Sequence, residues 1–154
     1  MVKIHSTSRL LSIKAPVILA QTDTTVGFLS QDELQLREIK ERESSKPFIK
    51  VFKNFHSLNV RIPNSKKRIL RRSKKTTFIV KDVAFRVVQE TPDSSLLRNM
   101  EWSFSTSANR KGESFHREFC EQKADIIIED NQSLKEKQSS TLLKMNNKKI
   151  KRLR

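Results

Sequence analysis

The sequence predicts an α/β fold: one domain built on a mixed parallel and antiparallel sheet with helices beside it. Strand-like runs outnumber helical runs, and the two kinds mix along the chain. The 154 residues suit a single domain over 1–154. Hydrophobic residues make up 35% of the chain, which is low for a globular protein but enough for a modest core.

Strands are expected where short apolar or alternating runs are bounded by polar residues. Pro16–Ala20 is such a run, and the hydroxyl-rich stretch 21–25 after it is expected to be a loop. Lys81-Asp82 and Asn146-Asn147 each separate two strand-like runs, which indicates two hairpins. The expected strands are 16–20, 48–52, 76–80, 83–88, 102–107, 125–129, 139–145 and 149–153.

Helices are expected where capping residues precede an apolar stripe. Ser30 and Glu33 have the spacing of a capping box, so the first helix should begin near Ser30. Ser114 can cap a later helix. The polar stretch 131–138 is expected to be mobile. The expected helices are 32–43, a short one within 66–75, another within 89–100, and 114–123.

The charge is strongly positive. The chain has 32 Lys and Arg against 17 Asp and Glu, a formal net charge of +15, which favours a polyanionic partner such as nucleic acid or nucleotide phosphates. A generally basic proteome is the alternative explanation. The single cysteine, Cys120, excludes an internal disulfide and indicates a reducing compartment. No apolar run approaches the roughly 20 residues that span a bilayer, so we expect a cytoplasmic protein with no membrane partner.

Several kinds of active site are excluded or unsupported. With two glycines the chain cannot form a phosphate-binding loop of the G-x-x-x-x-G-K-[ST] type. The three scattered histidines and one cysteine have no zinc-type spacing. No nucleophile elbow is present. Cys120 is expected to be a buried, inert thiol.

What remains is a set of hydroxyls, amides and cations near expected strand ends. Both glycines of the chain, Gly27 and Gly112, fall within it. Its segments are Thr22-Asp23-Thr24-Thr25-x-Gly27, Lys40-x-Arg42, Ser105-Thr106-Ser107-Ala108-Asn109-x-x-Gly112, Ser139-Ser140-Thr141 and Arg152. In this order and spacing the set resembles the motifs of the YrdC-type L-threonylcarbamoyladenylate synthase family, over about residues 17–154.

The resemblance implies a reaction and a fold. Members of the family condense ATP, bicarbonate and L-threonine to threonylcarbamoyl-AMP and pyrophosphate. The product serves the N6-threonylcarbamoyl modification of the tRNA adenosine beside the anticodon, through downstream threonylcarbamoyl-transfer proteins. The implied fold is a twisted, open mixed sheet with flanking helices and a basic face to which double-stranded RNA binding is attributed. ATP would be accompanied by a divalent cation, Mg²⁺, for which the sequence offers no dedicated site.

The resemblance also implies roles for particular residues. Those expected around the reacting phosphates are Lys40, Arg42, Ser107 and Asn109. Those expected to bind the nucleotide are Ser105, Ser140, Arg152 and Arg86. Those expected to shape the threonine and carbamate pocket are Thr22, Asp23 and Thr24.

Each assignment has a structural alternative. Lys40 and Arg42 could be an exposed helix end, residues 22–24 a polar loop, Arg86 one half of a structural ion pair, and Arg152 part of a basic tail. Two other functions also stay open. The chain could be a non-catalytic member of the same fold that binds tRNA or ribosomal RNA, or it could transfer a carbamoyl group to another acceptor.

The chain departs from the family pattern at several turns. Gln21 replaces the motif proline, and Val26 replaces an aromatic residue. Ser73–Lys75 stands where the family has a glycine- and proline-rich turn, and Arg154 stands where a late glycine is expected. The basic segments 66–75 and 144–154 have no interleaved aromatics, which argues against base-specific recognition of RNA.

Overall fold

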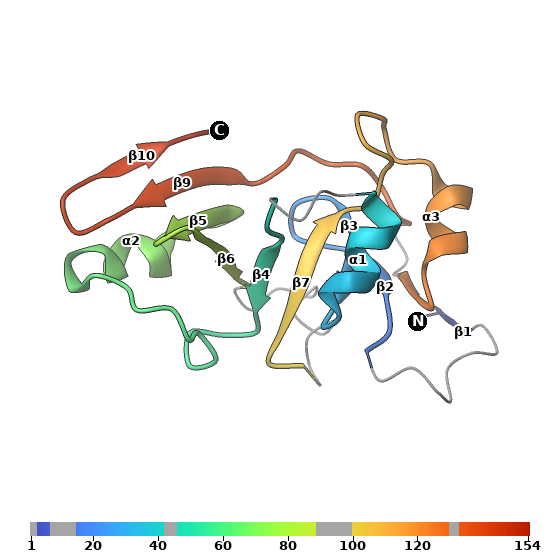
Figure 1. Cartoon of the computed structure of the whole chain (residues 1–154), viewed down its shortest axis with the longest axis horizontal. Coiled ribbons are helices and arrows are strands. Elements are labelled where there is room, and N and C mark those ends of the chain that lie inside the picture. Colours follow the sequence, from blue (N-terminus) through green and yellow to red (C-terminus); the bar gives the residue numbers. More distant parts are fainter. Residues whose placement is uncertain (1–2, 7–14, 42–45, 89–99, 130–132) are drawn as a thin grey trace.

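The computed structural model describes residues 3–6, 15–41, 46–88, 100–129 and 133–154. They form one mixed sheet in the order β1-β8-β2-β3-β7-β4-β6-β5-β9-β10. The pairs β2–β8, β4–β6 and β5–β9 are parallel, and the other pairs are antiparallel. The predicted α/β class with a mixed open sheet is therefore confirmed (Figure 1).

The strands are short, and they are distributed along nearly the whole sequence. They are β1 (Lys3–Ser6), β2 (Ile18–Gln21), β3 (Val26–Ser30), β4 (Ile49–Phe52), β5 (Thr76–Val80), β6 (Val83–Val87), β7 (Trp102–Ser107), β8 (Ile126–Glu129), β9 (Thr141–Met145) and β10 (Ile150–Arg152). The helices are α1 (Glu33–Lys40), the 3₁₀ turn η1 (Asn64–Lys66), α2 (Lys67–Arg72) and α3 (Arg117–Lys123).

The boundaries of α1 differ from the prediction. Ser30 is the last residue of β3, and its hydroxyl accepts a hydrogen bond from the Asp32 N–H. Asp32 is the true N-cap, because its carboxylate accepts from the N–H groups of Leu34 and Gln35. The helix ends at Lys40, since Glu41 adopts a left-handed conformation with φ 46°. Strand β3 was not predicted: it is buried at every position and shows no alternation.

Both predicted hairpins are confirmed. Lys81 and Asp82 join β5 to β6 with positive φ at both positions, as a type I′ turn requires. The side chain of Asn146 closes the β9–β10 turn by accepting from the N–H groups of Lys148 and Lys149. The basic run contains the predicted short helix, α2.

Three further predictions concern the cap of α3, the helix within 89–100 and the stretch 131–138. Helix α3 is capped by His116 instead of Ser114, and it therefore begins later than predicted. The helix expected within 89–100 falls almost entirely outside the described residues. Residues 133–138, expected to be mobile, are tied to the β2–β3 connection. The Lys135 N–H donates to Gln21 Oε1 and the Lys137 N–H donates to Thr25 Oγ1.

Helices cover two separate apolar clusters. Helices α1 and α3 lie over the β2–β3–β7 end, where Leu19, Phe28, Leu36 and Cys120 are almost fully buried. As predicted, Cys120 is a buried thiol: it donates to the carbonyl of Ala108, and burial raises its pKa. Helix α2 lies at the other end of the sheet, in a second cluster, and contributes Leu70 (Figure 1).

The opposite face of the central strands carries small and polar residues. Because side chains alternate along a strand, Ser103 and Ser105 of β7 point away from Phe104, which packs into the α1 cluster. The register places Val51 of β4 between Ser103 and Arg86. No helix among the described residues is long and apolar enough to cross a membrane.

Candidate functional site

The end of α1 is fastened to the loop that follows β7. Lys40 is the last residue of α1, and its Nζ donates to the Ser107 carbonyl at 3.1 Å and to Asn109 Oδ1 at 2.9 Å. It also donates to the Asn109 carbonyl. The structure thus brings together three of the four residues expected around the phosphates. The fourth, Arg42, lies outside the described residues.

The side chain of Asn109 closes this loop. Its Oδ1 accepts from the Ser107 hydroxyl at 2.6 Å, and its Nδ2 donates to the Glu113 carbonyl at 2.6 Å. Gly112 has φ +80°, a conformation that side-chain-bearing residues rarely adopt. The conformation of the loop therefore depends on one amide side chain, one lysine and one glycine.

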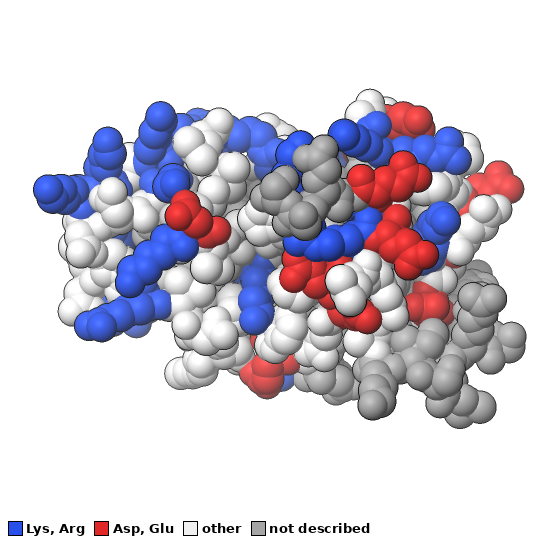
Figure 2. Space-filling model, in the orientation of Figure 1, with Lys and Arg blue, Asp and Glu red and all other residues white. Residues whose placement is uncertain are grey.

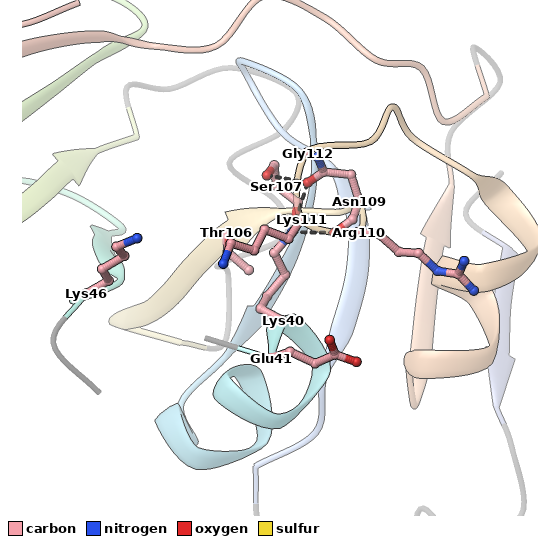
Figure 3. A pocket seen from close by; sticks show the side chains of 9 residues that line it. All are labelled: Lys40, Glu41, Lys46, Thr106, Ser107, Asn109, Arg110, Lys111 and Gly112. Carbon is pink, nitrogen blue, oxygen red and sulfur yellow. Dashed lines mark hydrogen bonds between the residues drawn. The ribbon is translucent and has the colours of Figure 1, made fainter. Parts of the chain in front are cut away.

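A cavity of about 250 Å³, the loop cavity, opens beside this loop (Figure 3). Four of its lining residues are cations and one is an acid, so the cavity suits an anionic group. Figure 3 shows Arg110 extending away toward α3, where its guanidinium lies 4.5 Å from the Phe119 ring centroid. The lining residues are Lys40, Glu41, Lys46, Thr106, Ser107, Asn109, Arg110, Lys111 and Gly112.

A second polar cluster joins the β2–β3 connection to β6. Arg86 Nη2 lies 3.2 Å from Asp23 Oδ1, and Arg86 Nη1 donates to Thr24 Oγ1 at 2.8 Å. The Thr22 hydroxyl donates to the Thr25 carbonyl at 2.6 Å and lies 3.2 Å from Thr24 Oγ1. The structure therefore places all four residues in one cluster, separate from the residues that line the loop cavity.

Arg86 is only 5% exposed, so its charge needs compensation. Burial lowers the pKa of Arg86, and the negative charge of Asp23 opposes that shift. Its Nε is buried without a hydrogen-bond partner in the described part of the chain, as is the Ser103 hydroxyl in the same cross-strand row. The ion pair expected as a structural alternative is thus present, with one donor of the guanidinium unused.

Ser105 of β7 lies diagonally across from Gly27 of β3, which is paired with Ser107. A Cβ on Gly27 would come 3.0 Å from the Thr106 carbonyl oxygen and 3.3 Å from Thr22 Cγ2, so a larger residue would press against both neighbours. Ser105 is nearly buried and is not among the residues that line the loop cavity. Gly27 lets β3 approach β7 and the turn at Thr22 closely.

Ser140 and Arg152 are not brought together. The Ser140 hydroxyl shares a 2.8 Å hydrogen bond with the buried Thr77 hydroxyl. Arg152 lies exposed on β10, where its Nε donates to the Arg154 carbonyl at 3.2 Å. The side chain that reaches Ser140 is Arg154, whose Nε donates to the Ser140 carbonyl at 3.2 Å.

Sequence reasoning missed several residues of these clusters. Lys111 lies between Asn109 and Gly112, inside the motif-bearing segment, and its position could have drawn attention to it. Lys46 and Thr77 offered no signal, because one is an isolated surface cation and the other a hydroxyl within a strand-like run. No group of three or more His, Cys, Asp or Glu that could hold a metal occurs among the described residues.

The chain is similar in fold to several solved structures. P. abyssi Sua5 complexed with L-threonine matches with a TM-score of 0.73 and 18% identity, over 90% of this chain and 50% of that one. E. coli YciO matches with a TM-score of 0.72 and 20% identity, over 92% of this chain and 83% of that one. Full-length HypF in its phosphate- and nucleotide-bound form matches with a TM-score of 0.74 and 14% identity, over 25% of its length.

The sequence identities to these solved structures are low, so the matches show the fold alone. The chain spans about half the length of the Sua5 protein from P. abyssi. None of the curated protein sequences matches it. The Sua5/YciO/YrdC family model, which is described as "Telomere recombination", matches residues 14–154. Because that match covers most of the chain, the protein belongs to the Sua5/YciO/YrdC family.

Proposed function

We propose that this protein is an L-threonylcarbamoyladenylate synthase. Threonine and bicarbonate first give N-carboxythreonine and water. A carbamate oxygen then attacks the α-phosphorus of ATP, forming threonylcarbamoyl-AMP and releasing pyrophosphate. The observation that carries the proposal is the loop cavity, in which a chain of this family gathers Lys40, Ser107 and Asn109 among further cations.

The proposed chemistry matches what the cavity offers. Adenylyl transfer of this kind needs little covalent help, so its barrier is lowered by positioning and by neutralising phosphate charge. The cavity supplies cations, and the hydrogen bonds of Asn109 hold their loop in one conformation before the substrate arrives. A group that is already in place costs no reorganisation at the moment of reaction.

The cluster of Asp23, Thr24 and Arg86 is the proposed threonine end of the site. Asp23 offers a carboxylate of the kind that attracts an ammonium group, and the buried guanidinium of Arg86 holds Asp23 and Thr24 in place. Support for an amino acid at this fold comes from P. abyssi Sua5, whose structure contains L-threonine. Ser105, Ser140 and Arg152 remain proposed nucleotide contacts, with Arg154 better placed than Arg152 beside Ser140.

Mg²⁺ would enter the site with the nucleotide. Among the described residues that line the loop cavity, Glu41 is the single carboxylate, which is too few for a protein-built magnesium cage. Mg²⁺ commonly binds through substrate phosphates, one or two carboxylates and several waters, and that arrangement fits a site rich in cations. The ion would neutralise phosphate charge, while the residues of the chain orient the nucleotide.

The proposed function is tested by pyrophosphate release. Purified protein is incubated with ATP, Mg²⁺ and bicarbonate, with and without L-threonine, and pyrophosphate is measured with a coupled phosphatase. We expect release that depends on threonine, and threonylcarbamoyl-AMP detected by mass spectrometry. D-threonine is the matched control substrate. Folded protein that releases no pyrophosphate in response to L-threonine would contradict the proposal.

A second candidate function is binding of RNA, and one surface favours it. A groove of about 810 Å³, the hairpin groove, lies beside the β5–β6 and β9–β10 turns. Figure 2 shows blue side chains gathered at this end of the molecule. Lys144 is paired with Asp82 at 3.0 Å, and no other acid lines the groove. Its cations are Arg61, Lys81, Lys144, Lys148, Lys149 and Lys151.

Cations of this kind bind phosphates with little regard to sequence, and the affinity falls steeply as salt rises. RNA binding and synthesis are compatible, since the proposed product serves tRNA modification and must reach threonylcarbamoyl-transfer proteins. We expect tRNA to bind with a strong salt dependence. Binding measured by fluorescence anisotropy at several salt concentrations tests this, and a flat salt dependence would contradict it.

A further inference from the structure

The ammonium group of Lys40 is fully used within the protein. A lysine has three N–H donors. Those of Lys40 face three acceptors: the carbonyls of Ser107 and Asn109, and Asn109 Oδ1. A phosphate could take a hydrogen bond from Lys40 only if the lysine left the loop that it holds. Its position therefore suits fastening the loop better than contacting the nucleotide.

The two polar side chains beside Lys40 are also engaged. The single hydroxyl proton of Ser107 goes to Asn109 Oδ1, and Asn109 Nδ2 donates to the Glu113 carbonyl. Arg110 is turned toward α3 and stacks on Phe119. Most of the donors that the motif brings to the cavity thus serve the loop itself.

Unlike Lys40 and Arg110, the cations Lys46 and Lys111 are not engaged by other described residues. Both line the loop cavity, both are exposed, and neither ammonium has a hydrogen-bond or ion-pair partner in the part of the chain that the structure describes. Figure 3 shows their ammonium groups extending toward the same opening from opposite sides. Lys111 comes from the loop after β7, and Lys46 comes from the segment before β4. The carboxylate of Glu41 points away from both.

We infer that Lys111 and Lys46 bind the nucleotide phosphates, and that Lys40 is a positioning residue. The inference rests on the proposed function for the identity of its ligand, a nucleoside triphosphate. Two cations on opposite sides of one opening repel each other weakly, and a ligand with several negative charges removes that repulsion. Lysine suits this task as a compact point charge, and the loop that carries Lys111 is held in one conformation by Asn109.

The first test measures binding of inorganic pyrophosphate by isothermal titration calorimetry, which requires no turnover. The variants are Lys111→Gln and Lys46→Gln, and Lys123→Gln on α3 is the matched control. Each loss of a charge-assisted hydrogen bond should weaken binding about tenfold to a hundredfold. The control should bind like the wild type. All three positions are exposed, so the melting temperatures should stay unchanged.

The role of Lys40 has its own test. In Lys40→Gln, amide hydrogen exchange should speed up in the loop 107–113, whereas in Lys111→Gln it should not. If the enzyme turns over, Lys111→Gln should raise the KM for ATP, whereas Lys40→Gln should mainly lower kcat. Lys40→Arg should restore part of the exchange protection, because arginine can still donate to the loop carbonyls.

The outcomes separate the two proposals. Pyrophosphate binding that depends on Lys111 and Lys46 supports the inference, even if threonine-dependent turnover is absent and the proposed function fails. If Lys111→Gln and Lys46→Gln bind pyrophosphate as tightly as Lys123→Gln does, the inference is wrong, even if the enzyme is active. Wild-type protein that binds no pyrophosphate also overturns it.

Discussion

The loop cavity and the hairpin groove are both cationic, but they hold their charges differently. In the loop cavity Lys40 is fixed by three oxygens, and Asn109 closes the loop that carries Lys111. In the hairpin groove the cations are exposed, and among them Lys144 has an ion pair with a largely exposed Asp82. An exposed pair of this kind contributes about 0–1 kcal/mol.

How firmly the charges are held determines what each region can do. Catalysis needs groups that are already in place, because reorganisation during the reaction raises the barrier. Attraction of a long polyanion needs only the density of charge, and it can use mobile side chains. The positive charge at these two places therefore serves one ordered site and one diffuse surface.

The largest expected effect is a loss of stability on breaking the buried ion pair of Arg86 and Asp23. Arg86→Ala leaves Asp23 without its partner, so the free energy of unfolding should fall by about 3–5 kcal/mol. Urea denaturation followed by circular dichroism measures this change. Arg86→Met, which keeps much of the side-chain volume, is the comparison. A loss below about 1 kcal/mol in both variants would show that the pair does not hold the β2–β3 connection to β6.

The next effect is on activity in the loop cavity. Asn109→Ala removes the side chain that closes the loop, so threonine-dependent pyrophosphate release should fall about 100-fold or more, as for other lost preorganised donors. Its control is Asn147→Ala, at the exposed hairpin turn. Equal activity of the two variants would mean that the order of the loop is irrelevant to the reaction.

A smaller effect is expected in the hairpin groove. The double variant Lys149→Glu/Lys151→Glu should weaken tRNA binding about tenfold or more and reduce its salt dependence, because phosphate contacts are lost. Pyrophosphate release should not change. The matched control is Lys135→Glu/Lys137→Glu, which alters the net charge equally at exposed positions outside the groove. The two double variants binding tRNA equally well would remove the groove from the account.

The smallest effect concerns the helix that carries Lys40. Asp32→Ala removes the N-cap of α1 and should lower the free energy of unfolding by about 1 kcal/mol. Ser30→Ala is the informative comparison, because the capping-box interpretation makes Ser30 the cap. Thermal denaturation of both variants is compared with that of Glu38→Gln, a variant at an exposed position of the same helix.

The sequence allowed much of the fold to be predicted, and the reasons are local. The hairpins at Lys81-Asp82 and Asn146-Asn147 have turn residues whose chemistry specifies them. Strand β3 could not be recognised, because a strand buried on both faces lacks alternation and contains Gly27. The capping-box spacing at Ser30 and Glu33 then placed the N-cap two residues too early, at Ser30 instead of Asp32.

The sequence predicted which residues belong to the candidate site better than it predicted which of them contact each other. The spacing brought Lys40, Ser107 and Asn109 to attention, and the structure joins them. That Arg154 and not Arg152 reaches Ser140 depends on how the last residues lie along β9, which a sequence pattern does not show. Gln21, in place of the motif proline, binds the Lys135 N–H and so acquires a structural task of its own.

The most direct test of the account measures pyrophosphate release from ATP and bicarbonate, with and without L-threonine, in three proteins side by side. These are the wild type, Asn109→Ala and Lys149→Glu/Lys151→Glu. The account predicts threonine-dependent release in the wild type and in the groove variant, and its loss in Asn109→Ala. Release that is independent of threonine in all three, or that fails in the groove variant while it survives in Asn109→Ala, would contradict it.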